Sequence, residues 1–256
     1  MISVVQLGTV DYATGLRLQQ QLVALRKEEK IGDVLLLLEH KPVITLGRNA
    51  KAKNVIASPE LLGQRGVELF DCDRGGDVTF HGPGQIVGYP IFDLRGHATP
   101  EGKRKTLGAV EFVRRLEEVL IRSCADFGIP AKRIPGLTGA WTESDTKIAA
   151  IGVHISRFVT SHGFALNVNT DLSFFKLIVP CGIESKPVTS MQRELGRELD
   201  LNAVAESLSR NFGFVFQSQM LWLDTLDALL GRTVGVPMRT PEELRKVRKE
   251  DDATWA

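Results

Sequence analysis

The amino-acid sequence predicts an α/β protein in which helices pack on a sheet, and three observations lead to this prediction. The chain has 256 residues, 43% hydrophobic and 25% charged, which is typical of a folded protein with a sizeable core. Short apolar and β-branched runs recur along it, as in strands. Longer segments carry apolar residues at helical spacing. Because we find no repeat and no linker before about residue 215, we expect one main domain over residues 1–215 and a C-terminal helical appendage with a charged tail over 216–256.

The first half of the chain predicts two helices and several strands. A helix over 13–30 ends before Gly32, and a shorter one begins at Ser58-Pro59, an N-cap followed by a proline. The predicted strands cover 33–39, 43–46, 67–70 and 86–94. We expect the first two strands to pair as a hairpin across Pro42. Pro90 indicates that the last is an edge strand or contains a bulge.

The second half predicts three helices and one pair of strands. The clearest helix covers 106–127, where apolar residues recur at helical spacing before Gly128 and Pro130. The segments 147–156 and 159–168 are expected to be antiparallel neighbours joined near Arg157. Further helices are predicted over 202–212 and 217–230.

Charge and hydropathy exclude several classes of protein. The formal net charge is +1, which gives no whole-molecule field for nucleic acid or an anionic membrane. The longest strongly apolar run, Val34 to Leu38, is too short to span a bilayer, and Met1 is not followed by a signal-peptide pattern. We therefore expect a cytoplasmic protein.

The three cysteines form neither a disulfide pattern nor a zinc motif. Cys72, Cys124 and Cys181 are far apart and include no CxxC pair. Cys124 falls on the apolar stripe of the predicted helix over 106–127 and is expected to be an inert core thiol. Cys181 lies instead in a Pro-Cys-Gly turn, where a thiol can be presented to a substrate.

A nearby cation would make Cys181 a useful nucleophile. An unperturbed cysteine, with a pKa of about 8.5, is mostly protonated at neutral pH. Lys147 is the candidate cation, because it precedes the apolar run Ile-Ala-Ala-Ile-Gly and would be partly desolvated there. The pair predicts an enzyme that carries an acyl group as a thioester.

A glycine-rich segment runs from Arg74 to Gln85, with the sequence RGGDVTFHGPGQ. Glycines allow main-chain N–H groups to approach a carboxyl, phosphate or oxyanion, although a tight structural loop explains the composition equally well. The segment is neither a Walker A motif nor a dinucleotide fingerprint. His81 within it is a candidate acid, base or hydrogen-bond donor.

Two other histidines follow further along the chain. His162 is expected at a strand edge that lines a pocket, and we assign no function to His154. No clustered His, Cys and carboxylate pattern predicts a metal site.

Four blocks of sequence together resemble the lipoyl(octanoyl) transferases. These blocks are RGGDVTFHGPGQIVGYP, KIAAIG, SHGFALNVNTDLSFF and IVPCGI, in this order and spacing. The resemblance covers roughly residues 30–195. It implies a mixed sheet with packed helices, related to the catalytic domains of biotin and lipoate protein ligases.

The resemblance also implies a reaction and its partners. The donor would be octanoyl-acyl carrier protein, and the acceptor a lysine of a lipoyl domain of a 2-oxoacid dehydrogenase or of the glycine-cleavage H protein. The reaction, a step in lipoate biosynthesis, would require neither ATP nor a metal.

The resemblance assigns roles residue by residue. Cys181 matches the acyl-thioester cysteine, and Lys147 matches the lysine that lowers the pKa of that cysteine. The residues that match the lining of the acyl site are Arg74, Gly75, Gly76, Asp77, Val78, Thr79, Phe80, His81, Ala150, Ile151, Gly152, Gly163, Phe164 and Ala165. We expect the oxyanion to be held by backbone N–H groups of Gly75-Gly76 or near Gly182.

Two alternative functions remain open. A lipoate-protein ligase has a similar glycine-rich loop and would activate the free acid with ATP, but it needs no thioester cysteine. A catalytically inactive acyl- or biotinyl-binding module is disfavoured because Lys147 and Cys181 are both present.

Acidic protein substrates would be expected to dock on a basic patch. Lys103-Arg104-Lys105 and Arg114-Arg115 are the candidates, although such charges also form ordinary solvated helix faces.

Overall fold

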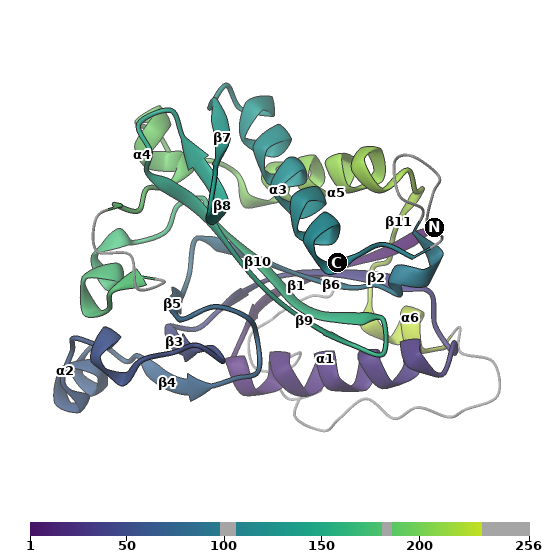
Figure 1. Ribbon diagram of the computed structural model, residues 1–256, viewed down its shortest axis with the longest axis horizontal. Helices are drawn as coiled ribbons and strands as arrows, with labels where there is room; N and C mark the ends of the chain where they lie inside the picture. The colour runs from purple at the N-terminus through teal and green to yellow at the C-terminus, as the bar shows by residue number, and fades with distance from the viewer. Residues whose placement is uncertain (98–105, 181–185, 232–256) are drawn as a thin grey trace.

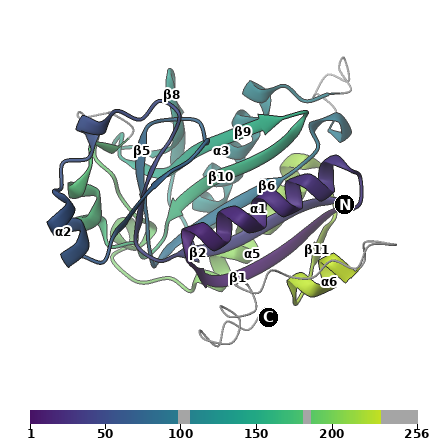
Figure 2. The same cartoon turned by 90° about the horizontal axis from the view of Figure 1, so that it is seen from below.

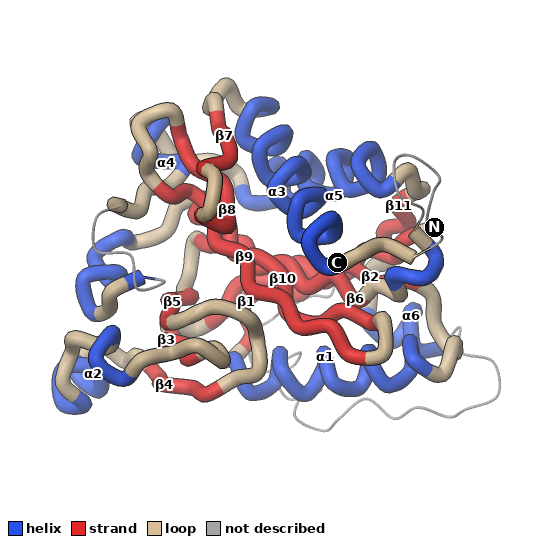
Figure 3. The backbone as a smooth tube through the Cα atoms, viewed as in Figure 1, coloured by secondary structure: helices blue, strands red, loops and turns tan. Residues whose placement is uncertain are grey.

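An eight-stranded mixed sheet forms the centre of the computed structural model, which describes residues 1–97, 106–180 and 186–231. The strand order is β11-β1-β2-β6-β10-β9-β8-β7. The strands are β1 (Ile2–Val10), β2 (Asp33–His40), β6 (Gln85–Ile91), β7 (Ala131–Ile134), β8 (Leu137–Thr142), β9 (Lys147–Ser156), β10 (Val159–Asn167) and β11 (Met220–Trp222). β1 runs parallel to both of its neighbours, and the other pairs are antiparallel. The predicted α/β fold with a mixed sheet is confirmed (Figure 3).

Helices cover both faces of this sheet. The helices of the described residues are α1 (Tyr12–Lys27), α2 (Pro59–Gln64), α3 (Ala109–Asp126), α4 (Met191–Leu195), α5 (Leu201–Phe216) and α6 (Leu226–Gly231), of which α2 packs with the smaller sheet described below. α3 and α5 lie on one face, and α1 crosses the other (Figures 1 and 2). Three short 3₁₀ turns complete the element list at Ala52–Asn54, Leu94–Gly96 and Leu172–Leu177.

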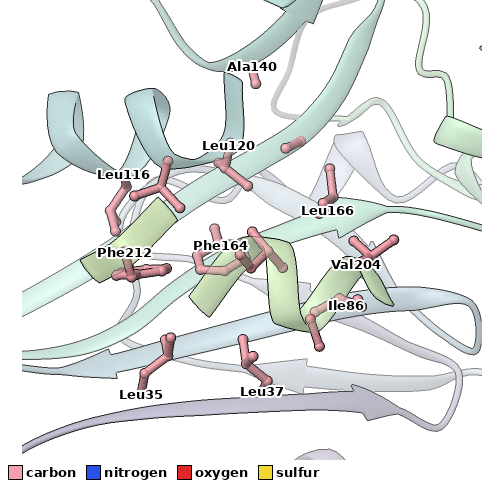
Figure 4. Packing of buried hydrophobic residues seen from close by; sticks show 14 of the residues in the cluster. Leu35, Leu37, Ile86, Leu116, Leu120, Ala140, Phe164, Leu166, Val204 and Phe212 are labelled. Carbon is pink, nitrogen blue, oxygen red and sulfur yellow. The ribbon is translucent and has the colours of Figure 1, made fainter. Parts of the chain in front are cut away.

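The main core lies between the sheet and the helices α3 and α5. Figure 4 shows Leu116 and Leu120 of α3 and Phe212 of α5 packed over the sheet. β2 contributes to both faces, since Leu35 and Leu37 enter this core while Leu36 packs in the core under α1. This explains why β2 reads as a continuous apolar run.

A second, three-stranded sheet lies beside the first, in the order β4-β3-β5. Its strands are β3 (Val43–Leu46), β4 (Glu68–Asp71) and β5 (Val78–His81). The predicted hairpin between 33–39 and 43–46 is therefore wrong. Both edges of β2 are already paired, with β1 and β6, so the chain leaves the main sheet after His40.

Two further local predictions are wrong. β6 is a central strand, not an edge, because it pairs with β2 on one side and with β10 on the other. Pro90 is tolerated because it lies beyond Gly88, where the ladder between β6 and β10 ends. The helix predicted over 217–230 is interrupted by β11, which pairs with β1. A separate unit over residues 216–256 stays a prediction, since 232–256 lie outside the described residues.

Candidate active site

The predicted glycine-rich segment is not one loop, because its middle, residues 78–81, forms β5. The loop that precedes β5, residues 74–77, packs closely against the end of β3 and against β9. A Cβ on Gly152 would lie 2.6 Å from the Gly75 carbonyl oxygen, and one on Gly47 would lie 2.4 Å from that of Gly76. Gly76 also has φ +90°, which favours glycine. These glycines therefore allow backbone segments to pack closely.

Arg74 anchors this loop. The buried guanidinium donates through Nε to Thr45 Oγ1 at 3.1 Å, through Nη2 to the Thr45 carbonyl at 2.7 Å and through Nη1 to the Gly75 carbonyl at 3.0 Å. Most of its donors are thus already engaged within the protein, which makes Arg74 part of a rigid wall.

A narrow cavity lies behind this loop, at the point where β5, β6, β9 and β10 meet. Most of the residues predicted to bind the acyl group line it: Arg74, Gly76, Asp77, Thr79, His81, Ala150, Ile151, Gly152, Gly163, Phe164 and Ala165. Gly75, Val78 and Phe80 do not. The side chains of Val78 and Phe80 are buried in a separate apolar cluster with Ile44 and Ile178.

Sequence reasoning missed four residues of this cavity as binding residues: Tyr12, Val87, Tyr89 and His162. The sequence predicts His162 at a strand edge that lines a pocket, and the structure places it in this cavity. It has φ +55°, and its Nε2 lies 2.7 Å from Asp73 Oδ1. Asp73 also contacts His154 Nδ1 at 2.5 Å. No short motif joins these residues, so their meeting depends on the fold.

His81, which lines the narrow cavity, is uncharged and is held in one orientation by its hydrogen bonds. Its Nδ1 lies 2.8 Å from Gln85 Oε1, and the Gln85 amide nitrogen is directed to the Phe80 carbonyl. Nδ1 therefore carries the proton and donates, which leaves Nε2 as the acceptor. Burial is the main cause that lowers the pKa of His81 to about 3. At neutral pH His81 is thus a hydrogen-bonding residue without charge.

His40, on β2, holds the cavity-lining residue Tyr89 in place. Its Nδ1 donates to the Val10 carbonyl at 2.8 Å, so its Nε2 accepts from the Tyr89 hydroxyl at 2.6 Å. Burial lowers the pKa of His40 to about 4. Burial likewise raises the pKa of Tyr89. These groups are all uncharged near neutral pH and present a fixed set of hydrogen-bond directions.

Lys147 is buried at the start of β9, with 7% of its surface exposed. Its Nζ lies 4.7 Å from the centroid of the Trp141 ring. Gly139 gives the side chain space, because a Cβ there would lie 3.6 Å from Lys147 Cε and 2.5 Å from the Ala149 carbonyl oxygen. The predicted desolvation of this lysine is confirmed.

Lys147 and Pro180 line one small cavity together with Ala150 and Ala165. The two alanines also line the larger cavity, so the spaces adjoin. Cys181, which follows Pro180, lies outside the described residues, as does Gly182. The geometry thus brings Lys147 next to the residue that precedes the predicted nucleophile.

The other two cysteines are ordinary free thiols. Cys124 is fully buried on α3, and burial raises its pKa to about 12, which agrees with an inert core position. Cys72 is half-buried, and its Sγ donates to the Leu46 carbonyl at 3.4 Å.

The expected oxyanion site is wrong for one of its residues. The Gly75 N–H donates to the Val153 carbonyl at 3.0 Å and is therefore engaged. Among the described residues, no group of three or more His, Cys, Asp or Glu side chains could hold a metal ion. No described helix is long and apolar enough to cross a membrane.

The fold and site together define an α/β domain in which a narrow cavity adjoins a buried lysine. The sequence matches the family model described as "Lipoyl protein ligase A/B catalytic domain" over residues 11–213. The chain belongs to this family.

Named relatives are similar over nearly the whole chain. A protein named octanoyltransferase from Koribacter versatilis is 63% identical over 253 residues, covering 98% of each chain. Another from Acidobacterium capsulatum is 56% identical over 237 residues, covering 90% of this chain and 96% of its own. The solved bipartite lipoate protein ligase from Thermoplasma acidophilum shares the fold, with a TM-score of 0.65 at 14% identity, and the match covers 97% of this chain and 90% of that one.

Proposed function

We propose that this protein is an acyltransferase of lipoate biosynthesis, which moves an octanoyl group from octanoyl-acyl carrier protein to a lysine. The acceptor is a lipoyl domain or the glycine-cleavage H protein, and the reaction takes place in the cytoplasm. The observation that carries the proposal is the adjoining pair of cavities. One has small and apolar residues on β9 and β10 opposite polar side chains, and the other is lined by Lys147 and Pro180.

The walls of the larger cavity suit an unbranched acyl chain. Ala150, Gly152 and Gly163 leave space, while Ile151 and Phe164 supply apolar contacts. Each buried methylene contributes about 0.8 kcal/mol to binding. Burial of the chain therefore supplies most of the affinity, and the rigid loop at Arg74 limits the shapes that enter.

The first half-reaction acylates Cys181. The thiolate sulfur attacks the carbonyl carbon of the donor thioester, the new C–S bond forms, and the bond to the carrier's sulfur breaks. The Lys147 ammonium stabilises the attacking thiolate and can protonate the leaving thiolate.

The second half-reaction discharges the enzyme. The acceptor amine attacks the Cys181 thioester, an amide bond forms, and the C–S bond breaks. Lys147 as a free amine then accepts a proton from the attacking nitrogen and returns it to the Cys181 sulfur.

The basic residues that the sequence suggests for docking of acidic protein substrates do not form a free patch within the described residues. Lys103-Arg104-Lys105 lies outside the described residues. Arg114 pairs with Glu117 at 2.7 Å, and Arg115 pairs with Glu111 at 3.6 Å, so these two already have partners within α3. A groove beside Pro180 carries the exposed cations Lys176 and Arg193, and we propose that acidic partners dock there.

A transfer assay tests the reaction and separates it from ligation. Octanoyl-acyl carrier protein and a lipoyl domain, without ATP, should yield an octanoylated acceptor lysine by mass spectrometry. Free octanoate with ATP should yield little. Brisk modification from octanoate and ATP, with none from the thioester, contradicts the proposal and favours a ligase.

A further inference from the structure

Asn167 at the end of β10 lies beside the proposed reacting centre. Its side chain is 3% exposed and lines the small cavity with Lys147, Pro180 and Gln85. A buried amide at this position is costly unless its donors and acceptor are satisfied. Its hydrogen bonds therefore indicate what it can do.

Neighbouring groups fix the orientation of the Asn167 amide. Its Oδ1 accepts from Gln85 Nε2 at 2.8 Å, and its Nδ2 donates to the Thr189 carbonyl at 2.9 Å. The carbonyl of Thr189 can only accept, so the nitrogen and oxygen of the amide are distinguished. Gln85 is itself held by His81 and the Phe80 carbonyl. The Asn167 amide is thus preorganised.

One N–H of this amide is left over. The amide nitrogen has two hydrogens, and within residues 1–97, 106–180 and 186–231 only the Thr189 carbonyl accepts one of them. The side chain borders the space beside Lys147. A buried donor without an acceptor favours a ligand that brings one.

We propose that the free N–H of Asn167 donates to the carbonyl oxygen of the acyl group while that group is transferred beside Lys147. This inference rests on the proposed function. When sulfur or nitrogen adds to the carbonyl carbon, the π electron pair moves onto oxygen. A fixed donor stabilises that negative charge more than it stabilises the ground-state carbonyl, and therefore raises kcat. When the leaving group departs, the pair returns and the hydrogen bond weakens.

The first test compares two asparagines of the same segment. Asn167→Ala should lower kcat for octanoyl transfer by about 10²–10³-fold, with KM changed less than about twofold. Asn169→Ala is the matched control. Asn169 also bridges backbone groups, with Nδ2 donating to the Leu199 carbonyl at 2.8 Å and Oδ1 accepting from the Leu199 N–H at 3.0 Å, but it does not border the cavity. It should leave kcat near the wild-type value.

The second test separates a catalytic donor from a merely structural amide. Octanal adds a thiolate and develops charge on oxygen, whereas the octyl thioether of N-acetylcysteamine has a methylene group in place of the thioester carbonyl. Asn167→Ala should weaken inhibition by octanal about 10²-fold and leave binding of the thioether within about twofold. Equal weakening of both ligands, or unchanged kcat, overturns the inference. If the wild-type protein forms no acyl adduct at all, the proposed function itself is overturned, and this inference fails with it.

Discussion

Lys147 and Trp141 are cross-strand partners on β9 and β8, and the Lys147 ammonium lies 4.7 Å from the centroid of the indole ring. This contact places the Lys147 ammonium over an aromatic face at a buried position. The indole ring therefore helps to orient the ammonium beside the small cavity that Lys147 lines.

Removal of this ring should slow transfer. A cation–π contact contributes about 0.5–2 kcal/mol, so Trp141→Leu should reduce the transfer rate by roughly 2- to 30-fold, while Trp141→Phe should retain most of it. Rates are measured below the unfolding temperature of each variant. Trp222→Leu, at a 40% exposed position on β11, is the control, and equal rates for the leucine variants at 141 and 222 would contradict this role.

Loss of the Lys147 charge should have a larger effect. Lys147→Met keeps the apolar stem but removes the ammonium, and kcat should fall about 10²–10⁴-fold. Lys132→Met is a suitable comparison, because Lys132 is only partly buried and pairs with Asp145 at 3.1 Å. A Lys147→Met protein that transfers as fast as the Lys132→Met protein would rule out Lys147 as the proton-transfer group.

Close packing at Gly152 should be sensitive to a single methyl group. Gly152→Ala places a carbon 2.6 Å from the Gly75 carbonyl oxygen, and overpacking of this kind costs about 1–3 kcal/mol of unfolding free energy. Gly32→Ala meets nothing within 4 Å. Urea denaturation should show a loss only for the first variant, and equal stability of the two would argue against the tight contact.

Stability should decrease in mild acid because of the buried histidines. Burial lowers the folded-state pKa of His40 from 6.5 to about 4, so between pH 6.5 and 4 the unfolded chain binds more protons. The stabilisation by neutral His40 is present above pH 6.5 and is lost as pH falls, by about 1.4 kcal/mol per pH unit. His40→Gln should show a smaller slope in denaturation midpoints across this range. An identical slope in both proteins would exclude His40 as the source.

Strands with a buried, continuous apolar run could be predicted from the sequence, and their pairing could not. The run over 33–39 predicts β2, but nothing in the local sequence indicates that β3 joins another sheet. β1, β7, β8 and β11 are not predicted from the sequence. In β1, polar residues such as Gln6 interrupt the apolar run, and the exposed Gly8 adds no apolar signal. The helix over 109–126 was predicted well, because Gly128, with φ +79°, supplies the expected stop.

In the candidate site, too, some residues could be predicted from the sequence and others are brought in only by the tertiary structure. Contiguous motifs identified Lys147, the glycine-rich segment and the walls at Ala150 and Phe164. Tyr12 comes from a helix whose local sequence carries no chemical signal. Tyr89 lies within the block RGGDVTFHGPGQIVGYP, but only the order of the strands shows that it reaches the cavity. The engaged N–H of Gly75 also depends on a tertiary contact, with Val153.

Intact-mass measurement with peptide mapping tests the central claim most directly. Wild-type protein mixed with octanoyl-acyl carrier protein should gain one octanoyl group at Cys181, and added lipoyl domain should remove it and gain the same mass. Cys181→Ser should form no such thioester, while Cys124→Ala should behave as the wild type. A wild-type adduct absent from Cys181, or one that is never discharged to the acceptor, would contradict the account.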